Sequence, residues 1–192
     1  MTEMRRRGGS TAVLAGFVAF LVAVGYLLAS SVAKRTVAVF EPTPVGRSRP
    51  VRPGVHSDTV TIDAGDAKAW RFFDVDLGSL VTPPDTSGWD LAFRRFHIRA
   101  ADAVADAGDV PFARVGRVPL QEFQGGWDGR DSANAAIRRW YDYSMLTHLL
   151  EPNGHVYVVR TREGRHAKLE VLSYYCRGLS PGCVTFRYEE IQ

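Results

Sequence analysis

Residues 155–175 read HVYVVRTREGRHAKLEVLSYY, and this stretch decides the fold class. On both sides of the turn at 162–165, aromatic and β-branched residues alternate with polar ones, which is typical of half-buried strands. Gly164 can supply the positive φ that such a turn needs. We therefore predict an antiparallel hairpin in which Thr161 lies opposite His166.

The same alternation extends outward from this hairpin. Short runs of it occur at 58–63 (DTVTID), 69–76 (AWRFFDVD) and 89–99 (WDLAFRRFHIR), separated by turn residues. A further strand after the cysteines completes a C-terminal meander. Only residues 131–146 could hold a short helix. The pattern predicts an all-β domain of many short antiparallel strands over residues 58–192.

Two cysteines, Cys176 and Cys183, flank a segment that contains Gly178, Pro181 and Gly182. This composition is that of a turn between strands, and a disulfide that closes it is typical of an exported domain. The alternatives are two reduced thiols or half of a metal site. Neither a CxxC motif nor a nearby Cys/His cluster supports a metal.

Near the N-terminus, residues 11–33 form a run of 23 uncharged residues, TAVLAGFVAFLVAVGYLLASSVA. As a helix, this run covers the ~30 Å hydrocarbon core of a bilayer. A cleaved signal peptide is the alternative, because Ser31-Val32-Ala33 resembles a cleavage site. The run is longer than the ~7–15 apolar residues of a signal peptide, so we predict a retained transmembrane helix.

Basic residues lie on both sides of this span and leave its orientation open. The predicted disulfide places the β domain in an oxidising compartment. We therefore expect a single-pass protein of the bacterial inner membrane. Its predicted parts are a cytoplasmic N-terminus (1–10), the transmembrane helix (11–33), a periplasmic linker (34–57) and a periplasmic β domain (58–192).

The linker and the helix both carry candidate contact residues. Prolines at 42, 44, 50 and 53 predict a semi-rigid spacer. Its Arg47, Arg49 and Arg52 could contact lipid head groups or an acidic partner. Small residues form stripes on the helix that would let another helix pack closely, although lipid-facing positions are an equal alternative. These are Ala15, Ala19 and Ala23 on one stripe, and Gly25 and Ala29 on another.

The distribution of charge argues against nucleic-acid binding. Residues 1–57 carry eight Lys/Arg and two Asp/Glu, a net of +6, whereas residues 58–192 carry sixteen and nineteen, a net of −3. A nucleic-acid-binding domain concentrates positive charge on its folded part. No nucleic-acid partner is therefore expected.

Several segments resemble the HmuY family. They are GWDLAFRR at 88–95, YVVRT at 157–161 followed by Gly164 and AKL at 167–169, and LSYYC at 172–176 leading to PGCVTFRY at 181–188. The resemblance spans residues 60–190 and implies an HmuY-like sandwich of short strands, in a family whose named members are exported haem-binding proteins. Those members are typically lipoproteins, whereas this chain has an apolar N-terminal run.

In the family's haem binders, two axial histidines or methionines hold the iron, and those ligands lie outside the segments quoted above. A resemblance in fold therefore does not establish that this chain binds haem. The candidate ligands in this sequence are His97, His148 and Met145. His155 and His166 belong to opposite ends of one hairpin and cannot clamp one iron between them.

No catalytic set is evident in the sequence, and we expect no enzymatic activity. The preferred interpretation is a cofactor-free, single-span accessory subunit of an integral-membrane complex, such as an electron-transfer or photosynthetic reaction-centre assembly. The alternative is a membrane-tethered haem-binding protein.

Overall fold

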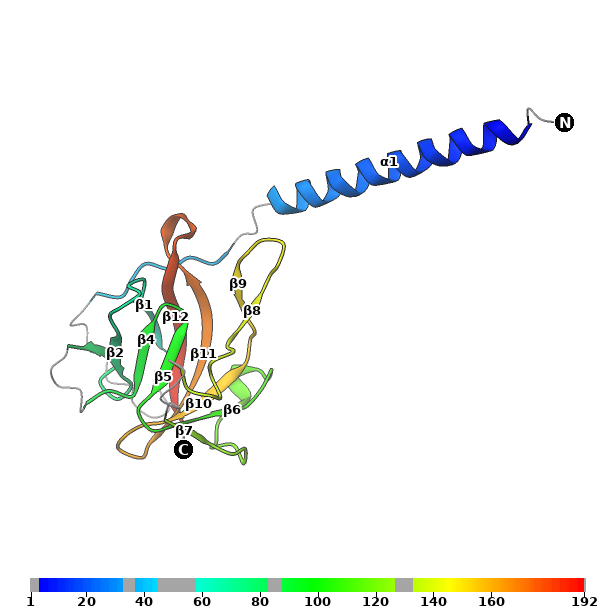
Figure 1. Ribbon diagram of the computed structural model, residues 1–192. Helices are drawn as coiled ribbons and strands as arrows, with labels where there is room; N and C mark the ends of the chain where they lie inside the picture. Colours follow the sequence, from blue (N-terminus) through cyan, green and yellow to red (C-terminus); the bar gives the residue numbers. More distant parts are fainter. Residues whose placement is uncertain (1–3, 33–36, 45–57, 83–87, 127–132, 192) are drawn as a thin grey trace. The chain divides into compact units, whose positions relative to one another are not determined.

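The computed structural model describes residues 4–32, 37–44, 58–82, 88–126 and 133–191. Its one α-helix, α1 (Met4–Val32), includes the apolar segment Thr11–Ser30, whose 20 residues are long and apolar enough to cross a membrane (Figure 1). None of this segment is buried against protein. A signal sequence has the same properties, so the choice between anchor and signal stays a prediction.

All the strands pair in antiparallel fashion and form three sheets. The six-stranded sheet has the order β1 (Asp58–Asp63), β12 (Pro181–Ile191), β11 (His166–Tyr175), β10 (Val156–Arg160), β6 (Ala103–Asp106), β7 (Gln124–Gly125). The four-stranded sheet has the order β3 (Ser79–Val81), β2 (Arg71–Asp74), β4 (Leu91–Arg94), β5 (His97–Ala100). A separate hairpin pairs β8 (Tyr141–Tyr143) with β9 (Leu150–Pro152). The predicted all-β architecture is confirmed.

Aromatic rings fill the core between the two larger sheets. Phe93 of β4 stacks on Phe186 of β12 with ring centroids 5.3 Å apart. Phe73 of β2 meets Phe186 and Tyr188 edge-on, at 5.3 and 5.5 Å. All four side chains are fully buried. Because such rings bury a large apolar area each, this contact is a substantial apolar link between the sheets.

A buried carboxylate adds a polar link between the same sheets. Asp90, only 2% exposed, accepts hydrogen bonds from the backbone N–H groups of Val75 and Arg162, both at 2.9 Å. Val75 directly follows β2, and Arg162 lies in the turn between β10 and β11. Burial raises the pKa of Asp90, while the two N–H donors oppose that rise.

Asp76 lies beside this link and has a strongly perturbed pKa. One of its oxygens is 2.5 Å from the guanidinium of Arg165, which also lies 3.5 Å from Glu190. Burial, followed by a hydrogen bond with Glu163, raises the pKa of Asp76 to about 7, and Arg165 opposes the rise. Asp76 therefore keeps a proton at a pH where an ordinary aspartate has lost it.

The β10–β11 hairpin forms as predicted, but its register is shifted by one residue. Arg160, not Thr161, lies opposite His166. Thr161 belongs to the turn, because its N–H donates to the carbonyl of Arg165 at 2.8 Å and its Oγ1 accepts from the Arg165 N–H at 3.2 Å. The shift leaves His155 and His166 at opposite ends of the hairpin.

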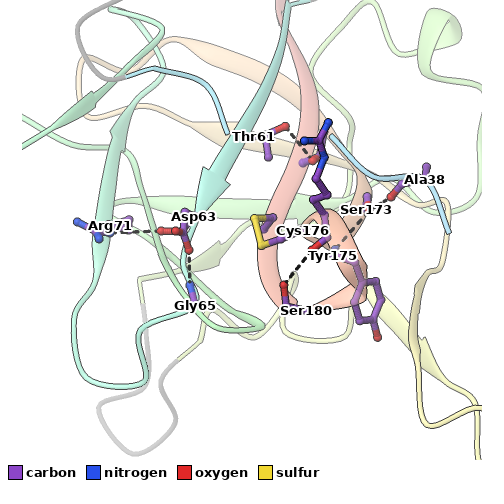
Figure 2. Close-up of a disulfide and its surroundings, with 12 residues drawn as sticks. Ala38, Thr61, Asp63, Gly65, Arg71, Ser173, Tyr175, Cys176 and Ser180 are labelled. Carbon is purple, nitrogen blue, oxygen red and sulfur yellow. Dashed lines mark hydrogen bonds between the residues drawn. A yellow bond between two sulfur atoms is a disulfide. The ribbon is translucent and has the colours of Figure 1, made fainter. Parts of the chain in front are cut away.

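Cys176 and Cys183 form the predicted disulfide, with their Cα atoms 4.9 Å apart. Figure 2 shows the bond at the end of β11, where the Cys176 N–H donates to the carbonyl of Ser180 at 2.8 Å. Gly182 is required at this point, because a Cβ there would lie 2.5 Å from the Cα of Gly65. The disulfide thus closes a hairpin that packs tightly against the chain after β1.

Residues 37–44, within the predicted linker, make hydrogen bonds to the β domain. Thr43 donates to the carbonyl of Thr61 at 2.9 Å and accepts from the Thr61 N–H at 3.0 Å. The hydroxyl of Ser173 donates to the carbonyl of Ala38 (Figure 2). This part of the predicted spacer is therefore attached to β1 and β11. Arg47, Arg49 and Arg52 lie outside the described residues.

The short helix considered for 131–146 does not occur within 133–146, the part of that range that the structure describes. Residues 135–139 form consecutive turns and residues 141–143 form β8. The turns do not continue into a helix, because residues 141–143 pair with β9. The side-chain amide of Asn134 donates to the carbonyls of Gln124 and Gly126 at 3.0 and 2.7 Å. The segment is thereby fixed by contacts outside itself.

We predict that Asp90→Ala lowers the free energy of unfolding by about 2–4 kcal/mol, because two buried N–H groups lose their acceptor. The measurement is urea unfolding followed by tryptophan fluorescence. Asp66→Ala, which removes an exposed carboxylate that accepts from its own turn, is the matched control and should change stability by less than about 1 kcal/mol. Equal effects of the two substitutions would contradict the assigned role of Asp90.

Raising the pH from 5 to 8 should destabilise the domain through Asp76. The folded-state pKa of this group is raised, so its contribution is present at low pH and is lost as the pH rises through about 7. After discounting for solvent screening, we expect a loss of roughly 1–2 kcal/mol between these pH values. The Asp76→Asn variant should show a smaller difference between its urea midpoints at pH 5 and pH 8, and an unchanged difference would refute the assignment.

Replacing both cysteines by serine should lower the free energy of unfolding by about 2 kcal/mol, since the closed loop is short. Mass spectrometry of the protein isolated from membranes should find no alkylatable thiol before reduction. Free thiols at both positions would contradict the oxidised hairpin.

Candidate functional site

The β4–β5 hairpin places His97 at the edge of the four-stranded sheet. Arg94 and His97 are paired across a two-residue turn, in which Arg95 has a φ of 54°. The N–H of Arg95 donates to the carbonyl of Ala64 at 2.7 Å, which holds the turn. The following residue, Phe96, stacks near the imidazole, with ring centroids 4.2 Å apart.

The segment 133–141 lies against this turn and forms the other wall of the site. The indole of Trp140, fully buried, donates to the carbonyl of Phe96 at 2.9 Å. The N–H of Asn134 donates to the carbonyl of Ile98, also at 2.9 Å. These two bonds join parts of the chain that are about forty residues apart in sequence, and they fix the segment beside β5.

Between the two walls lies an open hollow of about 260 Å³. It is lined by aromatic, apolar and cationic side chains, namely Phe96, His97, Ala133, Arg138, Arg139 and Tyr141. The rings of Phe96 and Tyr141 meet edge-on at 5.8 Å. One imidazole, two guanidinium groups and an aromatic wall suit a flat aromatic ligand that carries negative charge.

Haem has this chemistry, and the residues present fit part of it. An imidazole is a common iron ligand, and arginines pair with carboxylates such as the haem propionates. The hollow is at the small end for a ligand pocket, so it suits one edge of the porphyrin rather than the whole ring.

The other two candidate ligands lie together in a separate turn. Met145 and His148 belong to residues 144–149, which connect β8 to β9. The N–H of His148 donates to the carbonyl of Ser144 at 2.8 Å, and His148 has a φ of 55°. Met145 is 75% exposed, and Leu146 beside it is 57% exposed. The turn thus presents a thioether and an imidazole to solvent, and a pairing of His97 with His148 stays a prediction.

The two hairpin histidines have partners of their own. Nδ1 of His155 lies 3.0 and 3.1 Å from the two carboxylate oxygens of Asp106. His166 packs edge-on against Phe123, and burial followed by the charge of Arg160 lowers its pKa. Neither lines the hollow beside His97.

The small-residue stripes of α1 are exposed along their length. Ala15, Ala19, Ala23, Gly25 and Ala29 are all exposed, and no atom lies within 4 Å of a Cβ built on Gly25. Their role in helix packing stays a prediction.

Sequence reasoning did not find the partners of His97. Arg138, Arg139 and Tyr141 are distant in sequence, and no motif joins them to the β4–β5 hairpin. The only signal was local: the RRWY run at 138–141 combines two cations with two aromatic residues.

No protein-family model and no curated protein matches the chain. Solved structures do. The apo HmuY analogue of Tannerella forsythia aligns with a TM-score of 0.61 and 18% identity, over 74% of this chain and 98% of that one. A Bacteroides vulgatus protein assigned as an HmuY-like haem-binding protein aligns with a TM-score of 0.59 and 20% identity, over 76% and 97%.

A Bacteroides fragilis protein assigned as a lipoprotein gives a TM-score of 0.59 at 20% identity, over 72% of this chain and 91% of that one. At such identities the likeness establishes the architecture and not the ligand. Over most of its length, this chain has the fold of HmuY and the HmuY-like proteins.

Proposed function

We propose that this chain is a membrane-anchored, non-catalytic haem-binding protein. The observation that carries the proposal is the fold, shared over nearly the whole length of HmuY-type proteins, one of which is assigned as haem-binding. The hollow beside His97 supports it, because its side chains supply an iron ligand and cations for the propionates.

Each group in the hollow has a distinct task. The imidazole of His97 would ligate the iron. Arg138 and Arg139 would pair with the propionates, while Phe96 and Tyr141 would contact the edge of the porphyrin. The protein would hold the haem through these contacts, and Met145 and His148 stay candidate iron ligands on the sequence alone.

The anchor and the disulfide support a location at the outer side of an inner membrane. An apolar helix of 20 residues can span the bilayer, and the bond between Cys176 and Cys183 is typical of an oxidising compartment. We therefore propose a cytoplasmic N-terminus and a periplasmic β domain. The comparisons support haem binding and give no support to the role of accessory subunit in a reaction centre.

Haemin titration of the full chain in mild detergent tests the proposal. A Soret band distinct from that of haemin in detergent alone should grow and saturate at one equivalent. His97→Ala should weaken binding at least tenfold, because it removes an iron ligand.

His155→Gln is the matched control, because the imidazole of His155 is held by Asp106 away from the hollow. It should leave the titration unchanged. A wild-type titration identical to detergent alone would refute haem binding. Equal affinities of the wild-type and His97→Ala proteins would refute the site.

A further inference from the structure

The segment 107–126 covers the outer face of the six-stranded sheet and forms a second small core there. Phe112 is 6% exposed and lies between two cations, with Lys168 at 4.5 Å and Arg187 at 4.3 Å from its ring centroid. The cluster comprises Phe112, Val115, Val156, Val158 and Ile191, with Ala107, Val110 and Phe123 packed against it. The inner side of the segment is therefore fixed to the sheet.

The same segment also borders an open hollow of about 270 Å³. Its apolar lining includes Val110, Pro111, Val115 and Pro119. None of these residues lines the hollow beside His97. The two hollows are therefore separate sites.

Two arginines, Arg114 and Arg117, line this apolar hollow and are exposed. The nearby cations on the sheet are neutralised: Lys168 lies 3.2 Å from Glu189, and Arg187 pairs with Glu170. Within the part of the chain that the structure describes, no carboxylate forms such a pair with Arg114 or Arg117. Their charge is available to an anionic group placed over an apolar floor.

Leu120 is an exposed apolar residue next in sequence to the lining. Its side chain is fully exposed, at 105% of the reference area, directly after Pro119 of the lining. A leucine in this position can contact the part of a ligand that projects from the hollow, which would remove its own apolar surface from water.

We propose that this hollow binds the end of an amphipathic carboxylate, a fatty-acid-like molecule whose carboxylate pairs with Arg114 and Arg117 and whose chain lies on the apolar floor. The proposal does not depend on haem binding, because it uses different residues. The volume suits an acyl chain of medium length, since it is at the small end of ligand pockets.

The affinity of this site should depend on the length of the acyl chain. Each methylene buried in the hollow should raise affinity about fourfold, and the increase should stop once the hollow is full. A site that uses charge alone would show no such dependence. A site that uses only apolar contact would bind an alcohol of the same length equally well.

The test is photolabelling of the full chain in lipid nanodiscs with a diazirine-bearing decanoic acid, followed by peptide mass spectrometry. We expect adducts within residues 107–121. Unlabelled hexanoate, octanoate and decanoate should compete with increasing strength, and decanol should compete at least tenfold more weakly than decanoate.

Variants test the two arginines and the apolar space of the hollow independently. Arg114→Gln with Arg117→Gln should reduce labelling of residues 107–121 at least tenfold. Gln121→Trp, at an exposed position on the lining, should block it by filling the hollow. Arg177→Gln, which removes an exposed arginine elsewhere, is the control and should have no effect.

Labelling confined to α1, or equal labelling of the wild-type and double-arginine variants, would overturn the proposal. So would a dimer that the Gln121→Trp substitution dissociates and decanoate leaves intact, because a second copy would then be the occupant. Failure of the haemin titration would leave this result unaffected, so the two proposals can fail separately.

Discussion

The carboxylate of Asp90 is the constraint on which the relation between the two large sheets depends. It accepts N–H groups from both sides of the core, one after β2 and one in the β10–β11 turn. An apolar side chain at this position would leave both donors buried and unpaired. Asp90 also begins the chain segment that becomes β4, so the same carboxylate positions the β4–β5 hairpin and, at its end, His97.

Much of the fold could be predicted from the sequence because its signals are local. Alternation of side chains predicted the β10–β11 hairpin, and the turn composition between the cysteines predicted the disulfide. The register was missed by one residue, since it depends on hydrogen bonds that Thr161 makes within the turn. The predicted helix is absent from residues 133–146 because residues 141–143 pair with β9, a contact that the local pattern does not predict.

The candidate site was predictable only in part, for a related reason. His97 could be named as a candidate iron ligand because it is a histidine. The other side chains that line its hollow come from a segment some forty residues further along the chain. The bond from Trp140 to the carbonyl of Phe96 brings that segment in. Such a long-range backbone contact has no periodicity or spacing in the sequence. The arginines of the second hollow were missed too, because they lie in a loop whose packing depends on Phe112.

The attachment of residues 37–44 affects how mechanical load would enter the domain. Tension from the N-terminal side would first reach Ser173 and Thr61 through their bonds to Ala38 and Thr43. Ser173 lies three residues before Cys176, at the end of β11 that the disulfide closes. Because a covalent bond resists forces that separate hydrogen-bonded strands, the attachment at Ser173 lies near the end where β11 and β12 are hardest to pull apart.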